Sequence, residues 1–414
     1  MRGLKTNELI SEYSGSSNYT GPAVKLGAGT TGGEAALLVS AAGYRMVTGD
    51  CPTVGVAAGY SMGGGHGLLN SVNGLASDNV LEWEVVTATG EHLVATETQN
   101  QDLYWALSGG GGGTYAVVLS MTARIFQDGQ VGAATLRFNR TASPSTEVYT
   151  EALSLWWQAL PPIVDAGVTA LYQISDGEFW LQNATAPGQT AEQIKALLDP
   201  YLEQLTELDI PFEVESWTAP TYSQHYSDTN GPLPEGIYPT TMLFNSRLIP
   251  RAVSETAERS KNLSLAMEEA IASDPSAGFF FGCSALNVWD KPHPDNSVVS
   301  YWREAIAVCI NIAIYDWELP QAEMLARRVH MADVITPLIE AQTQDSGAYL
   351  NEIDPLVYPQ GNLMWQKDFY GSNYERLLNI KKKWDPDSLL YAPTAVGSDE
   401  WMQDDSGRLC KASP

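Results

Sequence analysis

The sequence predicts an α+β fold made of three consecutive parts, and three observations support this prediction. Over residues 22–125, short β-rich runs alternate with glycine clusters. The clusters stop near residue 128, and from there to residue 345 long helical patterns alternate with apolar strands. Residues 346–414 contain a helical pattern that stops at Asp385-Pro386. A chain of 414 residues has room for more than one domain, and we expect domains at 1–128, 129–345 and 346–414.

The first part is predicted to contain short strands and two helices. β-Branched residues flanked by glycine or aspartate indicate the strands. Gly32–Ala42 and Gln101–Gly109 have helical patterns, and a hairpin is expected to turn at Thr89-Gly90. The predicted strands cover residues 22–29, 44–50, 79–96 and 114–126.

The second part is predicted to be an antiparallel sheet backed by helices. One helix is expected to kink or break at Pro200, and a hairpin is expected around Asp176-Gly177. The apolar run 303–317 fits either a strand or a helix. The predicted helices cover 145–159, 191–205 and 254–273, and the predicted strands cover 241–250 and 278–289.

The charge of the chain excludes several classes of partner. Lys and Arg number 23 against 49 Asp and Glu, which gives a formal net charge of −26. Such a surface repels nucleic-acid phosphates and anionic membranes, so we expect neither as a partner. The sequence has no apolar run long enough to span a membrane. We expect a monomer that acts on a small molecule.

Cysteine and histidine are scarce. The four cysteines are too few and too scattered for a disulfide scaffold, and they form no C-x-x-C pair. The five histidines form no H-E-x-x-H motif. We therefore predict no metal site.

Two glycine-rich segments are the most informative features of the sequence. Gly49–Gly67 includes three consecutive glycines, which let a backbone approach a ligand closely and expose N–H donors. Asp102–Val118 places five glycines between a short helix and a strand, where they would form a second wall against the same ligand. The alternative for both segments is a flexible loop. Neither segment matches a P-loop or a nicotinamide-binding fingerprint.

A third segment, Gly347–Pro355, contains candidate pocket residues. On a strand, Tyr349 and Asn351 would face one side while Leu350 and Glu352 face the other. Two polar groups on one face beside an acidic residue suit a substrate pocket. The alternative is an exposed edge strand.

Together and in this order, these segments resemble the berberine bridge enzyme-like flavoproteins of the vanillyl-alcohol oxidase superfamily, and most of all their fungal FAD-linked members. The resemblance covers residues 21–401. Its motifs are GDCPTVG at Gly49–Gly55, GGGHG at Gly63–Gly67, GLASD at Gly74–Asp78, VVTATG at Val85–Gly90, DLYW at Asp102–Trp105, YLN at Tyr349–Asn351, YGSNYERL at Tyr370–Leu377 and WDP at Trp384–Pro386.

The resemblance implies a PCMH-type FAD-binding domain, a separate substrate-binding sheet and a C-terminal segment that returns to the FAD domain. It also implies that the sulfur of Cys51 is bonded to flavin C6, with clustered backbone N–H groups favouring the thiolate. The alternative for Cys51 is a buried apolar thiol. The implied cofactor contacts are Cys51, Pro52, Thr53, Val54, Gly55, Gly59, Ser61, Gly64, Gly65, His66, Gly67, Asp78, Tyr115, Val117 and Asn373.

The implied reaction is oxidation of an alcohol, amine or similar C–H centre, with hydride transfer to flavin N5 and reoxidation by O2. Relatives place a pocket tyrosine near Tyr349, which we predict to be the base or the partner of the base, although a phenol needs a neighbour to act at neutral pH. Asn351 would orient the ring or the substrate. Glu352 stands where many relatives have tyrosine, and it either replaces the base or faces away. For His66, a structural hydrogen bond is the favoured role.

The sequence departs from the family in its amino-terminal part. No R-x-x-G-H occurs, so the usual histidyl attachment to FAD is absent, and Ala116 stands where the family generally has glycine. We interpret the chain as truncated at the amino terminus, which puts its FAD affinity in question. The family is usually secreted, yet Met1–Val24 has no apolar signal core, so localisation stays open. The alternatives to an oxidase are a flavin-free remnant without turnover and a flavin dehydrogenase that excludes oxygen.

Overall fold

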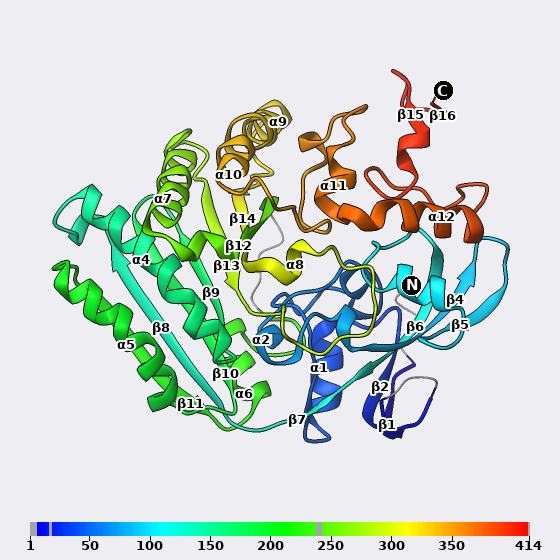
Figure 1. The fold of residues 1–414 in the computed structure, drawn as a ribbon, viewed down its shortest axis with the longest axis horizontal. Helices are drawn as coiled ribbons and strands as arrows, with labels where there is room; N and C mark the ends of the chain where they lie inside the picture. Colours follow the sequence, from blue (N-terminus) through cyan, green and yellow to red (C-terminus); the bar gives the residue numbers. More distant parts are fainter. Residues whose placement is uncertain (1–5, 16–18, 237–241, 413–414) are drawn as a thin grey trace.

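The computed structural model describes residues 6–15, 19–236 and 242–412, and Figure 1 shows how their helices and strands are arranged. Within these residues two large antiparallel sheets lie side by side, and the carboxyl-terminal segment (orange and red) lies against the amino-terminal part. The α+β prediction is confirmed. The domain bounds at residues 128 and 345 stay predictions.

The smaller of these two sheets belongs to the amino-terminal part and has the strand order β1-β2-β6-β4-β5. A capping box begins α1, where Thr31 and Glu34 exchange side-chain to backbone hydrogen bonds of 3.0 and 3.3 Å. The elements of this part are β1 (Glu8–Tyr13), β2 (Gly21–Gly27), α1 (Gly32–Ser40), β3 (Tyr44–Arg45), α2 (Asn70–Asn73), β4 (Val80–Thr87), β5 (His92–Ala95), α3 (Gln101–Leu107), β6 (Ala116–Arg124) and β7 (Phe126–Gln127).

The larger sheet belongs to the middle part and has the order β11-β8-β10-β9-β13-β14-β12. Helices α4, α5, α7 and α10 cover one of its faces, as Figure 1 and the buried core show. The elements are β8 (Val131–Asn139), α4 (Thr146–Asp165), β9 (Thr169–Ile174), β10 (Glu178–Pro187), α5 (Ala191–Glu207), β11 (Phe212–Ala219), α6 (Tyr222–Asn230), β12 (Met242–Pro250), α7 (Ala257–Ala272), β13 (Phe280–Ala285), α8 (Tyr301–Glu304), β14 (Ala305–Ile314), α9 (Gln321–His330) and α10 (Thr336–Gln342).

The carboxyl-terminal segment packs back onto the amino-terminal part. Leu377 and Ile380 of α12 share a buried core with Leu103 of α3 and with Tyr115. The predicted return of this segment to the first domain is therefore seen in the packing. Its elements are α11 (Met364–Tyr370), α12 (Tyr374–Trp384), β15 (Trp401–Gln403) and β16 (Leu409–Lys411).

Several local predictions are corrected by the structure. Helix α5 continues through Pro200, because its buried face, including Leu198 and Tyr201, packs on the sheet and offsets the lost hydrogen bond. The ambiguous run 303–317 contains strand β14, and a disulfide joins Cys283 to Cys309 on neighbouring strands. Thr241, the first residue of a predicted strand, lies outside the described residues. No helix in the described ranges is long and apolar enough to cross a membrane.

Candidate functional site

A cavity of about 470 Å³ lies where the glycine-rich segments and the carboxyl-terminal segment meet. Most of its lining residues are glycine or have small apolar side chains. The lining residues are Ala58, Gly59, Met62, Gly111, Gly112, Gly113, Thr114, Ala116, Val117, Val118, Leu350, Asn351, Phe369, Tyr370, Leu390, Ala392, Pro393, Thr394 and Ala395. The two predicted walls therefore do face one space.

Glycine is required at two positions around this cavity. Gly111 has a φ of +94°, a conformation that other residues rarely adopt. A Cβ on Gly63 would lie 2.4 Å from the side-chain nitrogen of Asn351. Because the backbone at Gly63 carries no side chain, Asn351 can reach into the first glycine segment. There its Nδ2 donates to the carbonyl of Gly59 at 3.0 Å.

Beside the cavity lies a polar cluster of four residues, in which His66 and Tyr349 are buried, Glu352 is partly buried and Asn351 is exposed. His66 Nε2 contacts the two carboxylate oxygens of Glu352 at 3.0 and 3.2 Å. Asn351 Nδ2 also donates to the Tyr349 hydroxyl at 2.8 Å. The rings of His66, Tyr349 and Trp302 lie 5.3 to 5.9 Å apart. Asn351 thus links the cluster to the cavity, since it alone of these residues lines it.

The segment around Tyr349 is a turn, which corrects the predicted strand. The Glu352 N–H donates to the carbonyl of Tyr349 at 2.9 Å, so the side chains do not alternate between two faces. The edge of β12 fixes this turn, because Ser246 N–H donates to the carbonyl of Glu352 at 2.8 Å. Tyr349, Asn351 and Glu352 therefore all belong to one cluster, and Glu352 faces His66.

Burial and charge shift the pKa values of the cluster. Burial lowers the pKa of His66, but the charge and hydrogen bond of Glu352, and then Asp50, outweigh it and raise that pKa overall. Burial raises the pKa of Tyr349 well above its usual value, and the charge of Glu352 raises it further. Burial likewise raises the pKa of Asp50 to about 6, with the charge of Glu352 adding to it and His66 opposing it.

The loop that carries Cys51 is held by the start of α1. The N–H groups of Gly32 and Gly33 donate to the carbonyls of Val54 and Pro52, each at 2.8 Å. Cys51 is partly buried, and its sulfur lies 3.3 Å from the Thr53 hydroxyl. The predicted contacts Thr53, Val54 and Gly55 are exposed, whereas Pro52 is buried.

Of the predicted cofactor contacts, only Gly59 and Val117 are lining residues of this cavity. Gly64, Gly65 and Gly67 adjoin His66 along the chain, and Gly64 and Gly65 have φ angles of +119° and +77°. Ser61 and Tyr115 are buried, and their hydroxyls donate to the carbonyls of Val56 and Gly110. Asn373 donates to the carbonyls of Ser297 and Val298 at 3.2 and 3.4 Å. Their roles as cofactor contacts, like that of Cys51, stay predictions.

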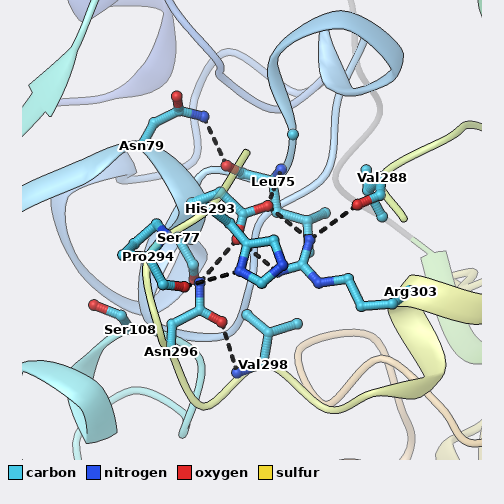
Figure 2. A network of polar contacts seen from close by, with 12 residues as sticks. Leu75, Ser77, Asn79, Ser108, Val288, His293, Pro294, Asn296, Val298 and Arg303 are labelled. Carbon is cyan, nitrogen blue, oxygen red and sulfur yellow. Dashed lines mark hydrogen bonds and ion pairs between the residues drawn. The ribbon is translucent and has the colours of Figure 1, made fainter. Parts of the chain in front are cut away.

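Asp78 lies in a separate network that joins the two large sheets. Its fully buried carboxylate accepts hydrogen bonds from both terminal nitrogens of Arg303, at 2.8 and 2.6 Å, and from Asn296 at 2.8 Å. Figure 2 shows Arg303, Asn296 and Leu75 within this network of polar contacts. In this structure Asp78 therefore has structural partners, and its predicted contact with a cofactor is untested.

Sequence reasoning missed three contributors to the site. Trp302 and the loop Ala392–Ala395 come from parts of the chain with no glycine motif of their own. The loop does follow the Trp384-Asp385-Pro386 motif, which is the feature that points to it. Asp50 stands inside the Gly49–Gly55 motif, directly before Cys51, and its acidic side chain was the available clue.

Comparisons with known proteins place the chain in a family. Residues 348–397 match the family model described as berberine and berberine like. An FAD-linked oxidoreductase from Neocamarosporium betae is 55% identical over 395 residues, covering 95% of this chain and 67% of the relative. The chain belongs to the berberine bridge enzyme-like family of FAD-linked oxidoreductases.

Two further members of this family extend the comparison. A bifunctional decalin synthase from Penicillium decumbens is 46% identical over 409 residues, covering 99% of this chain and 70% of that relative. The crystal structure of a VAO-type flavoprotein from Myceliophthora thermophila has a TM-score of 0.94 and 42% identity, covering 100% of this chain and 73% of the other. The predicted family, fold and oxidoreductase class are therefore confirmed.

The residues around the cavity fit the FAD that the family implies. A flavin has apolar faces and a polar edge, which match small apolar walls with exposed backbone groups. The volume of about 470 Å³ lies in the usual range for small-molecule sites. The missing side chain at Gly111 and the short one at Ala58 leave room for a flat ring. Gly59, Gly111, Gly112 and Asn351 would hold it.

Proposed function

We propose that this oxidoreductase removes a hydride from a carbon beside a hydroxyl or amine of a small secondary metabolite. The observation that carries the proposal is Asn351, which lines the glycine cavity and also binds the Tyr349 hydroxyl. A substrate in the cavity would meet Asn351, which connects it to the Tyr349 phenol and, beyond that ring, to His66 and Glu352. The relative named a decalin synthase supports a secondary metabolite as substrate.

When bound, FAD supplies the hydride acceptor at N5 and passes the electrons to O2. The protein then has two tasks, which are to orient the substrate and to remove its proton. The Glu352 carboxylate lies 3.0 and 3.2 Å from His66 Nε2, so this pair is our candidate for the base.

Tyr349 suits a different role from the predicted base. Its raised pKa keeps the phenol protonated at neutral pH, so it does not readily accept a proton. Its oxygen accepts a hydrogen bond from Asn351, which leaves the phenolic hydrogen to donate to the substrate oxygen. We therefore propose that Tyr349 orients the substrate while Glu352, through His66, receives its proton.

We also propose that the sulfur of Cys51 would bond to flavin C6, with loss of the thiol hydrogen and the ring hydrogen and transfer of two electrons to O2. Acid denaturation of the holoprotein should leave the flavin absorbance and the added mass on the chain. Cys51→Ser should release the flavin on denaturation, whereas Cys410→Ser, which changes the other partly buried free thiol, should not. Release of flavin from the unchanged protein would contradict covalent attachment.

The catalytic proposal is tested by anaerobic flavin reduction with a panel of small alcohols and amines. Glu352→Gln should lower the rate of flavin reduction by the best substrate about 100-fold or more, because a positioned base contributes that much to the rate. Tyr349→Phe should also slow reduction, but its rate should keep the pH dependence of the original protein. Glu91→Gln, on an exposed turn, is the matched control. Unchanged reduction in Glu352→Gln would overturn the assignment of the base, and reoxidation that does not consume O2 would indicate a dehydrogenase.

A further inference from the structure

The chain around Asp50 lies directly beside the loop that carries His66. A Cβ on Gly67 would lie 1.9 Å from the Thr48 carbonyl oxygen and 3.3 Å from the Gly49 Cα, so only glycine fits there. Across the same contact, a Cβ on Gly49 would lie 3.8 Å from the His66 carbonyl oxygen. The glycines therefore let the two backbones touch, and this contact places Asp50 next to the polar cluster.

Asp50 and His66 each have one buried polar atom without a partner. Asp50 Oδ1 and His66 Nδ1 are both buried, and neither has a hydrogen-bond partner among the described residues. The other ring nitrogen of His66, Nε2, is occupied by the Glu352 carboxylate at 3.0 and 3.2 Å. Buried polar atoms are rarely left unpaired in proteins, and one bridging water molecule would satisfy both of these.

The charges of Asp50 and His66 act on each other. Burial is the largest influence on both groups, and it raises the pKa of Asp50 and lowers the pKa of His66. After burial, the charge of His66 lowers the pKa of Asp50, and the charge of Asp50 is one of those that raise the pKa of His66. Glu352 opposes ionisation of Asp50, and the phenols of Tyr60 and Tyr222 also lie within reach of its charge. His66 is therefore the group in this set that stabilises the Asp50 carboxylate.

The two carboxylates beside His66 differ in how well their negative charges are stabilised. Glu352 contacts the imidazole directly at 3.0 Å, whereas Asp50 Oδ1 has no partner among the described residues. A proton added to these three groups should rest on the carboxylate whose charge is less stabilised, which is Asp50. An imidazole can take up a proton at one nitrogen and release one from the other, so His66 can carry a proton from one carboxylate to the other.

Resting on the proposed function, we propose that Asp50 is a positioning residue that stores the proton released by the substrate. The His66–Glu352 pair accepts this proton first, and His66 Nδ1 passes it to Asp50 Oδ1 through one water molecule. The substrate C–H bond gives a hydride to flavin N5, its O–H or N–H bond gives the proton, and a C=O or C=N bond forms. O2 then takes two electrons and two protons, one from the flavin and one from Asp50, and becomes hydrogen peroxide.

Proton release during flavin reduction tests this inference. The holoprotein is mixed anaerobically with its best substrate near pH 7, in weak buffer that contains a pH-indicator dye. The original protein should release well under one proton per flavin, because ionised Asp50 takes the proton up, whereas Asp50→Asn should release one. Near pH 5, where Asp50 is already protonated, the original protein should also release one. Asp387→Asn, which changes an exposed aspartate, is the matched control.

A second measurement does not depend on turnover and separates this inference from the proposed function. An infrared pH titration of the oxidised holoprotein should show the carbonyl band of a protonated carboxylic acid that disappears near pH 6. Asp50→Asn should lack this band, and Asp387→Asn should keep it. If no alcohol or amine reduces the flavin, the proposed function fails, and the titration still tests Asp50 itself. Absence of the band from the original protein, or equal proton release by the original protein and Asp50→Asn near pH 7, would overturn Asp50 as the proton store.

Discussion

At the scale of single residues, Asp50 is the least satisfied group near the site. Its backbone carbonyl accepts hydrogen bonds from the Tyr226 hydroxyl and Asn230, so its position is fixed. Its Oδ1 is buried and has no hydrogen-bond partner among the described residues. An ionised carboxylate in this environment is costly, which is why burial raises its pKa to about 6.

Asp50 should therefore make stability depend on pH in a defined direction. Between the unfolded pKa, about 4, and the folded pKa, about 6, the native state binds more protons than the unfolded state, so stability falls as pH rises. Asp50→Asn removes this cost. We expect its thermal unfolding temperature to match the original protein at pH 4 and to exceed it above pH 6, by the equivalent of about 2 to 3 kcal/mol.

The same thermal series with Asp387→Asn is the control, because Asp387 is exposed. That variant should follow the original protein at every pH. Parallel curves for Asp50→Asn and the original protein would show that the carboxylate is solvated in the native state.

The residue types in the sequence were enough to predict several side chains of the site. They were not enough to predict which of these side chains contact one another. Tyr349, Asn351 and Glu352 were expected from one segment, and His66 from another. Their contact depends on a turn that places Glu352 against His66 across 286 positions of sequence. The alternation of side chains along a strand cannot predict the contact between Glu352 and His66, because the register of β12 against the turn is a tertiary property.

At the scale of elements, hydrophobic periodicity and capping were sufficient to predict a helix or strand where local sequence alone determines it. Ser145, where the predicted helix starts, caps α4, since its side chain accepts from the Val148 N–H at 3.3 Å. Helix α4 nevertheless runs to Asp165, past the predicted end, with Pro161 and Pro162 inside it. Its buried tryptophans, Trp156 and Trp157, anchor it on the sheet, so tertiary packing outweighs the local helix breakers.

Helix α12 shows what an element contributes beyond its own hydrogen bonds. The buried ammonium of Lys381 donates to the carbonyls of Thr114 and Leu390, at 2.8 and 2.6 Å, and pairs with Asp385. Thr114 and Leu390 both line the cavity, one from the amino-terminal part and the other from the carboxyl-terminal segment. One cation therefore holds these two parts of the lining together. In sequence, Lys381 is one of three consecutive lysines, and nothing local distinguishes it from its exposed neighbour Lys382.

At the scale of the whole molecule, the site depends on how the two large sheets are held together. The amino-terminal part lines the cavity together with the carboxyl-terminal segment, whereas the middle part contributes Trp302 of α8 beside it. The ion pair between Asp78 and Arg303 joins these parts, and Asp78 is fully buried. A buried ion pair contributes little net stability, but removal of one partner leaves an uncompensated charge. Removal of Arg303 and removal of Asp78 should therefore lower the free energy of unfolding by different amounts.

We expect Arg303→Met to destabilise the holoprotein by about 3 to 5 kcal/mol in urea unfolding, because the carboxylate of Asp78 stays buried and unpaired. The double variant Arg303→Met with Asp78→Asn should recover part of this loss, since no buried charge is left. Flavin release and loss of ellipticity should coincide in the original protein and separate in Arg303→Met, as the sheets unfold at different denaturant concentrations. Arg259→Met breaks an exposed pair with Glu255 and should cost under about 1 kcal/mol. Equal costs for Arg303→Met and Arg259→Met would show that this network does not hold the two sheets together.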